Sequence, residues 1–291
     1  MTATKFEIAV LGPLGTYTHE AAFKGFGTDA TYAEQASIAD VFHALSPNLP
    51  LGVIPQENSI FGTVVETYDL LRTSQSAFIR GEIVLKVEHC LLVKKGVQLH
   101  QIQKVLSHEQ ALGQCRDFLS KMLPKAKTVK TKSTAAAAQE LLENPPNCAA
   151  ICSSICAQLL PELEILFTAV QNERSNFTRF YVIAHSQHES IPRTLTYEMK
   201  ALLRISSNSA GILDTPSNVM SRLISQNILI RRIDRRPSLD SIPFSSIYFL
   251  EVYADVQQQP GLSFESWTEE IDAAASKMGV TDRTVSVLGI W

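Results

Sequence analysis

Residues 173–184 read "ERSNFTRFYVIA", a stretch that carries polar side chains directly into a core strand. The apolar run "FYVIA" at its end is typical of a buried strand. Polar groups at the entrance of such a strand lose part of their hydration and therefore need partners. Asn176, Thr178 and Arg179 thus either satisfy neighbouring backbone groups or bind a ligand.

Strand-like and helix-like signals alternate on the N-terminal side of this stretch. Short apolar runs that predict strands lie at 6–11, 51–55, 102–106 and 164–170. Apolar residues at helical spacing predict helices over 37–45 and after residue 107. This alternation predicts an α/β architecture with a largely parallel sheet, in which the long β-rich segment 77–95 crosses between two lobes.

The C-terminal part of the chain has a different order. A polar connector, "HSQHESIPRT" (185–194), changes the composition and predicts a domain boundary. Beyond it the pattern predicts strand, helix, two strands, helix and strand. This βαββαβ order is that of a ferredoxin-like unit, which at this size often serves in binding or pairing.

Composition and charge exclude several classes of protein. The chain has 291 residues, 45% of them hydrophobic, and a formal net charge of −3. These values predict a well-packed core and no general nucleic-acid binding. The basic stretch "RRIDRR" (231–236) is interpreted as a sheet face or a subunit contact. No secretory signal or membrane-spanning stretch is recognisable, so we expect a cytoplasmic protein with no membrane contact.

Five cysteines are present, and three of them recur every fourth residue at 148, 152 and 156. This spacing matches no usual zinc or iron–sulfur pattern. Cysteine is also among the residue types that are most often buried. We therefore predict free thiols packed in the core, and no metal site.

Three polar clusters follow or open predicted strands, where ligands bind in α/β sheets. The first is "GPLGTYT" (12–18), in which Thr16 either contacts a ligand or simply caps a helix. The second contains Glu57, Asn58 and Ser59, which make a better anion cradle than a helix cap needs. The third is the opening stretch, where Arg179 suits a carboxylate because it can form two parallel hydrogen bonds. Metal-binding, Ser-His-Asp and cofactor patterns are missing, so any reaction must be easy once the substrate is held.

Several motifs together resemble one family. "GPLGTYT", "PQENSIFGTV", "EHCLLV", "SHEQALGQC" and "NFTRF" closely resemble prephenate dehydratase, and the βαββαβ unit looks like the ACT regulatory domain of that family. The resemblance implies a catalytic domain over 1–185 and an ACT domain over 194–291. The catalytic domain would have two lobes, like a type II periplasmic binding protein, and the lobes would divide near 77 and 165.

The resemblance also implies a reaction that needs no cofactor. Prephenate, a dianion with a ring hydroxyl, would lose CO₂ and water and become phenylpyruvate. The family assigns help for the departing hydroxyl to the threonine that is Thr178 here, and Glu57 is an alternative proton source if burial raises its pKa. Residues implied in substrate binding are Thr16, Asn58, Ser59, Asn176, Arg179 and Phe180. Core packing is an alternative role for Phe180.

Feedback inhibition by phenylalanine is implied through two motifs of the ACT domain. The first matches "SAGIL" (209–213) and the second "DRRP" (234–237), where the family has Glu-Ser-Arg-Pro. Residues expected to contact the effector are Ala210, Gly211, Ile212, Leu213, Asp234 and Arg236. Asp234 shortens the usual acid and Arg235 adds bulk, so the identity of the effector stays open among the aromatic amino acids.

Two other functions fit the same motifs. An arogenate dehydratase would take the aminated substrate, and a non-catalytic amino-acid sensor would combine a binding-protein fold with an ACT unit. The pairing habit of ACT units predicts a homodimer or a homotetramer.

Overall fold

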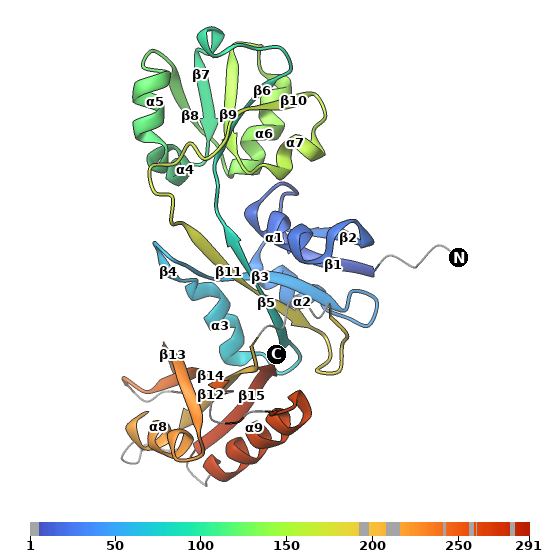
Figure 1. The fold of residues 1–291 in the computed structure, drawn as a ribbon, viewed down its shortest axis with the longest axis vertical. Coiled ribbons are helices and arrows are strands. Elements are labelled where there is room, and N and C mark those ends of the chain that lie inside the picture. Colours follow the sequence, from blue (N-terminus) through green and yellow to red (C-terminus); the bar gives the residue numbers. More distant parts are fainter. Residues whose placement is uncertain are drawn as a thin grey trace, which may run out of the picture. The chain divides into compact units, whose positions relative to one another are not determined.

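The computed structural model describes residues 6–191, 198–207, 216–240, 243–255, 259, 261–279 and 283–291 (Figure 1). The chain forms two compact units that interleave in sequence. The first unit comprises the residues up to Ala44 together with 51–64 and 83–180, and the second comprises 45–50, 65–82 and 181–291. Within the described residues, every helix is too short or too polar to cross a lipid bilayer.

The first unit begins with a sheet in which β1 lies between β2 and β3, both parallel to it. The elements of this part are β1 (Phe6–Leu11), α1 (Tyr17–Phe26), η1 (Gly27–Asp29), β2 (Ala30–Gln35), α2 (Ile38–Ala44), β3 (Leu51–Asn58) and β4 (Gly62–Thr63), and β11 (Phe177–Ala184) begins in this unit. β11 lies beside β3 on the side away from β1. The N–H of Ser59 donates to the carbonyl of Phe177 (2.8 Å), so β11 begins where β3 ends.

A second sheet in the same unit has the strand order β10-β6-β9-β7-β8. Its elements are β6 (Cys90–Lys94), η2 (Leu99–Gln101), β7 (Lys104–Ser107), α4 (Glu109–Gln114), α5 (Arg116–Met122), β8 (Lys127–Lys130), α6 (Thr134–Glu143), β9 (Cys148–Cys152), α7 (Ile155–Leu159) and β10 (Leu163–Phe167). Alternating residues of β6 and β9 point to two separate cores, one beneath α6 and α7 and one beneath α4 and α5. Helices therefore cover both faces of this sheet, as in other α/β folds (Figure 1).

The second unit is built around an antiparallel sheet of order β13-β14-β12-β15. Its elements are α3 (Val65–Thr73), β12 (Lys200–Ser207), α8 (Pro216–Ile224), β13 (Ile228–Pro237), β14 (Ser246–Ala254), α9 (Phe264–Met278) and β15 (Arg283–Ile290), and β5 (Phe78–Lys86) begins in this unit. The strand order is that of the ferredoxin-like βαββαβ fold. Its core joins Trp267, Ile271 and Met278 of α9 to the inward residues of β12 and β14.

Most predicted elements are confirmed, including the helix over 38–44, the extended segment around 77–95 and the complete βαββαβ order. All five cysteines are free and buried, which confirms their core role. The prediction of a largely parallel sheet was too simple, because β6 pairs antiparallel with both β9 and β10. The helix predicted after residue 107 is divided into α4 and α5 at Cys115, whose backbone leaves the helical conformation. The boundary near 185–194 stays a prediction.

Candidate active site

Two of the predicted polar clusters meet at one edge of the first sheet. β1 and β3 run parallel, so their carboxyl ends, with the segments that follow them, reach the same edge. β11 starts at this edge, and Val87 N–H donates to the carbonyl of Asn176 there (2.8 Å). Residues about 120 positions apart are thereby brought into direct contact, as Asn58 and Thr178 show.

Asn58 is the centre of the first group of contacts. Its Oδ1 accepts from the backbone N–H groups of Ile60 (2.9 Å) and Phe61 (3.1 Å). An oxygen that accepts two backbone donors fixes which way the amide faces. Its Nδ2 therefore points the other way and donates to Asn176 Oδ1 (2.7 Å) and Thr178 Oγ1 (2.9 Å). The hairpin that follows β3 thus orients the amide that holds Thr178.

The Thr178 hydroxyl is held as an acceptor. Because Asn58 donates to its oxygen, its own proton points elsewhere, and among the described residues no acceptor for that proton is found. Thr178 is partly exposed, while Asn176 beneath it has only 2% of its surface exposed. A donated hydrogen bond also polarises a hydroxyl and makes it a better donor. The geometry therefore presents a positioned O–H at the sheet edge.

Glu57 and Arg179 form a second pair. Arg179 Nε lies 3.4 Å from Glu57 Oε1, and both side chains are about three-quarters buried, with 22% and 28% exposure. Successive strand residues point to opposite faces of the sheet. Glu57 and Arg179 therefore lie on the face opposite to Asn58 and Thr178. The same edge thus offers a hydroxyl on one face and an ion pair on the other.

Ser59 is engaged with the neighbouring backbone. Its hydroxyl donates to the carbonyl of Ser175 (3.0 Å) and accepts from the N–H of Phe177 (2.9 Å). These two bonds join the start of the hairpin to the start of β11. Its side chain therefore has a structural function in addition to any contact with a ligand.

The segment 12–18 leads into α1 and is closely packed against its neighbours. Thr16 caps this helix, because its hydroxyl accepts from His19 N–H (3.3 Å) and donates to the carbonyl of Leu11 (2.7 Å). Gly15 adopts a φ of 102°, and a Cβ there would lie 2.9 Å from Cys156 Sγ. Both bonds at Thr16 support the capping alternative that the sequence left open.

Comparison with known proteins agrees with the motifs at this edge. The family model for prephenate dehydratase matches residues 8–188.

The chain belongs to the prephenate dehydratase family.

Individual relatives match most of the chain or nearly all of it. The bifunctional chorismate mutase/prephenate dehydratase of Escherichia coli K12 is 30% identical over 295 residues, which cover 98% of this chain and 70% of that protein. The chloroplastic arogenate dehydratase 5 of Arabidopsis thaliana is 32% identical over 232 residues, which cover 79% of this chain and 53% of that protein.

Solved structures with the same fold agree over the whole chain. Prephenate dehydratase from Arthrobacter aurescens, in complex with L-Phe, has a TM-score of 0.77 at 24% identity and covers 98% of this chain and 89% of that one. GqqA, described as a quorum-quenching acylase, has a TM-score of 0.75 at 23% identity and covers 98% and 97% of the two chains. At these identities the likeness shows the fold alone, which is the two-lobed, periplasmic-binding-protein-like fold that was predicted.

The remaining residues predicted for the prephenate dehydratase site lie in other surroundings. Phe180 is buried, with 1% of its surface exposed, which favours its alternative role in core packing. Asp234 is held by Arg232 Nε (2.5 Å) and Nη2 (3.2 Å), and Arg236 is paired with Asp69. Ala210, Gly211, Ile212 and Leu213 lie outside the described residues.

A buried polar chain near the site was not predicted as a unit. Tyr17 Oη lies 2.5 Å from His89 Nδ1, and His89 Nε2 lies 2.5 Å from Gln114 Oε1. Burial lowers the pKa of His89 and raises that of Tyr17, so both groups are neutral at pH 7. All three residues belong to motifs quoted above. The sequence did not predict their contacts, because Tyr17 and His89 are 72 residues apart and His89 and Gln114 are 25 residues apart.

Proposed function

We propose that this chain is a prephenate dehydratase that converts prephenate to phenylpyruvate, CO₂ and water. The bond from the ring to its carboxylate breaks and releases CO₂, and that electron pair forms the new ring double bond. The C–O bond to the ring hydroxyl breaks in turn, and the departing oxygen takes up one proton to leave as water. Aromaticity makes the reaction strongly downhill, so the protein has only to orient the dianion and assist the leaving group.

The observation that carries this proposal is the orientation of Thr178. Its oxygen accepts from Asn58, whose amide is fixed by two backbone donors, so its O–H is directed away from the protein partner. A hydroxyl held in this way can donate to the departing oxygen. General acid assistance contributes about 10²–10⁴-fold to a rate, and a positioned reactant contributes more.

Arg179 is the proposed partner of a substrate carboxylate. A guanidinium binds carboxylates through planar, paired hydrogen bonds, and here Glu57 already occupies its Nε side at 3.4 Å. A substrate that lies across the sheet edge meets Arg179 on one face and Thr178 on the other. We assign Glu57 the role of orienting Arg179, and keep its service as proton source as the alternative.

Regulation by phenylalanine belongs to the same proposal. The Arthrobacter relative was solved in complex with L-Phe, and this chain has a ferredoxin-like unit that carries Asp234 and Arg236. We propose that phenylalanine binds this unit and inhibits turnover. Assembly as a homodimer or homotetramer and a cytoplasmic location stay predictions from the sequence.

A turnover assay tests the main claim. The purified chain is incubated with prephenate and no added cofactor, and phenylpyruvate is read by ultraviolet absorbance in alkali. We expect product at a rate proportional to enzyme concentration, and inhibition when phenylalanine is present. A chain that binds phenylalanine and forms no product would be a sensor, and the proposal would be wrong.

Arogenate is the second candidate substrate, because the Arabidopsis relative is named for it. The two substrates differ only in a keto or amino group on the side chain. Comparison of kcat/KM for the two compounds decides between them. We expect the larger value for prephenate.

A further inference from the structure

Helix α3 follows the polar sheet edge without an intervening loop. Residues 57–63 form a hairpin in which Glu57 pairs with Thr63 and Asn58 with Gly62. Val64 N–H donates to the carbonyl of Gln56 (2.9 Å), and α3 begins at Val65. The hairpin that orients Asn58 therefore continues directly into the first turn of α3.

Within the second unit, an ion pair joins α3 to the predicted effector motif 234–237. Arg236 binds Asp69 with two parallel bonds, Nε to Oδ1 at 2.8 Å and Nη2 to Oδ2 at 2.9 Å. Arg72 of the same helix donates to the carbonyl of Pro237 (2.8 Å) and lies 3.4 Å from Asp69. Two-point contact of this kind fixes direction as well as distance.

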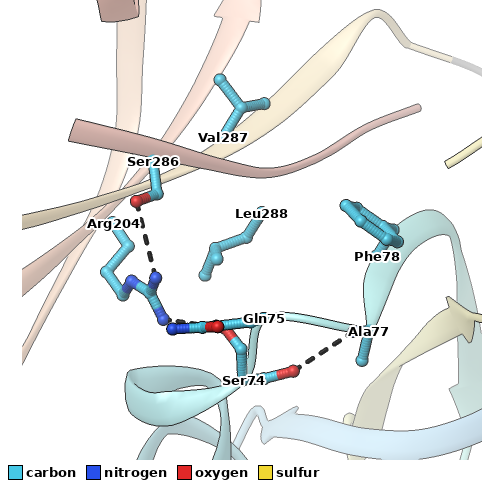
Figure 2. Close-up of a pocket in the computed structure, with 8 residues that line it drawn as sticks. All are labelled: Ser74, Gln75, Ala77, Phe78, Arg204, Ser286, Val287 and Leu288. Atoms are coloured by element: carbon cyan, nitrogen blue, oxygen red, sulfur yellow. Dashed lines mark hydrogen bonds between the residues drawn. The ribbon is translucent and has the colours of Figure 1, made fainter. Parts of the chain in front are cut away.

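The other end of α3 is capped from β12. Arg204 Nη1 donates to the carbonyls of Leu71, Arg72 and Ser74, each at 3.0 Å. Figure 2 shows this guanidinium beside Ser74 and Ser286. These residues line a cavity of about 290 Å³. The carbonyls at the end of α3 bind the Arg204 guanidinium and complement its charge. We therefore interpret Arg204 as the C-terminal cap of α3, and propose no ligand for the cavity.

The middle of α3 is joined to the same motif through a buried aromatic ring. Tyr68 has no exposed surface, and its ring meets Phe249 edge-on with a centroid distance of 5.1 Å. Arg232 lies over the Tyr68 ring at 5.8 Å and binds Asp234 of the effector motif. Arg236 of the motif thus contacts α3 directly, and Asp234 is linked to it through Arg232.

We propose that Asp69 is a positioning residue that transmits occupancy of the effector motif to the active-site hairpin through α3. This inference rests on the proposed function and names the route of its regulation. When phenylalanine binds Arg236, the two hydrogen bonds from Arg236 to Asp69 weaken and α3 shifts. Asn58 then loses its alignment with Thr178, so the effect falls on kcat more than on KM.

The variant Asp69→Asn tests this route without altering a residue predicted to touch the effector. Asparagine keeps the shape of the side chain but removes its charge. The matched control is Glu66→Gln, which removes one charge from an exposed position on the same helix. We expect both variants to bind phenylalanine within about threefold of the unaltered chain, as measured by calorimetry.

The two variants should differ in how strongly bound phenylalanine inhibits turnover. Inhibition by saturating phenylalanine, expressed as the ratio of kcat without and with it, falls by about fivefold or more in Asp69→Asn, because couplings of this kind typically lie between about 5- and 150-fold. The ratio stays unchanged in Glu66→Gln. Unchanged inhibition in Asp69→Asn, with phenylalanine bound, overturns the proposal.

Hydrogen exchange of the peptide 56–64 separates this inference from the proposed function. Phenylalanine should alter exchange of this peptide in the unaltered chain and in Glu66→Gln, and leave it unchanged in Asp69→Asn. If prephenate is not turned over but this pattern is found, the route holds and the proposed function fails. If phenylalanine leaves the peptide unchanged in the unaltered chain, the route is wrong, whatever the turnover.

Discussion

At the scale of single residues, the site depends on an amide whose direction is set by backbone. Asn58 Oδ1 accepts two N–H groups of its own hairpin, so Nδ2 has one direction in which to donate. Thr178 then receives a hydrogen bond instead of giving one. A threonine hydroxyl is a very weak acid and is hardly ionised at neutral pH. It can assist the departing group here because its proton has a fixed direction.

Removal of the Thr178 hydroxyl should therefore affect chemistry more than folding. We expect Thr178→Ala to lower kcat by about 10²-fold or more, with the thermal midpoint changed by only a few degrees because the residue is partly exposed. Thr178→Ser, which keeps the hydroxyl, is the control and should retain most of the activity. Steady-state kinetics and circular dichroism give both readouts, and near-normal turnover in Thr178→Ala would refute its assigned role.

Acid sensitivity is expected at His19, which lies in the first turns of α1 next to the segment 12–18. The side chain is 2% exposed, its Nδ1 accepts from Gly15 N–H (3.2 Å), and burial lowers its pKa to about 4. The unfolded chain, with a histidine pKa near 6.5, binds this proton first, so stability is complete above about pH 6.5 and is lost as the pH falls towards 4. Protonation also removes the acceptor for Gly15.

Urea unfolding at about pH 7 and about pH 4.5 measures this effect. We expect the unaltered chain to lose about 2 kcal/mol more over this interval than His19→Gln, which does not titrate. The comparison uses the two pH slopes, because the substitution also removes the contact of the ring with Tyr32. Equal slopes would mean that His19 does not carry the acid response.

At the scale of elements, the tightest constraint lies in the segment before α1. Gly15 combines a φ of 102° with a backbone carbonyl that accepts from Ser153 Oγ (2.6 Å). The two glycines of "GPLGTYT" allow the backbone to come close to a neighbour. The sequence did not indicate that the neighbour is the segment 153–156, because nothing in local spacing specifies a contact 138 residues away.

Gly15→Ala should destabilise the fold. The new Cβ would lie 2.9 Å from Cys156 Sγ and 3.3 Å from Ala135 Cβ, in a backbone conformation that alanine rarely adopts. Strain and overpacking together cost about 2–4 kcal/mol. Gly113→Ala is the matched control: it lies in α4 with nothing within 4 Å of the new Cβ, and should be neutral or stabilising by up to about 1 kcal/mol. Equal unfolding free energies for the two variants would contradict this account.

Elements with strong periodicity were predictable, and those without it were not. The helix over 38–44 and the βαββαβ unit follow from apolar spacing. β8 did not stand out, because all four of its residues are exposed and carry no apolar alternation. β9 reads "CAAIC", whose small residues have no strand signature, although all five are buried. Tertiary packing decided both strands.

At the scale of the whole molecule, the motifs identified the family, whereas contacts between distant segments had no signal in the spacing. The contacts of residues 65–82 group them with 181–291. The reason is the set of bonds that joins α3 to the C-terminal sheet, among them Asp69 to Arg236, 167 residues apart. Individual site residues were predictable from motifs, while their partners required the fold.

The two tryptophans of the chain offer a test of this division. Trp267 and Trp291 both belong to the second unit and are almost completely buried. Trp291 meets the Tyr181 ring edge-on at 5.6 Å, and its backbone exchanges hydrogen bonds with Lys200. Tryptophan fluorescence therefore reports on the second unit, whereas far-ultraviolet circular dichroism is dominated by the helices of both.

Trp291→Ala should consequently weaken one unit and spare the other. Removal of a fully buried aromatic side chain costs about 3–5 kcal/mol, and the core of the C-terminal sheet is distinct from the two cores on either face of the β6–β9 sheet. We expect the urea midpoint read by the remaining Trp267 to fall, while part of the circular dichroism signal keeps its original midpoint, because units with their own cores can unfold separately. Ile60→Ala, which shortens an exposed side chain of the first unit, is the control and should move neither transition. Coincident fluorescence and circular dichroism curves in Trp291→Ala would show instead that the chain unfolds as one cooperative body, and that α3 joins the two units energetically as well as covalently.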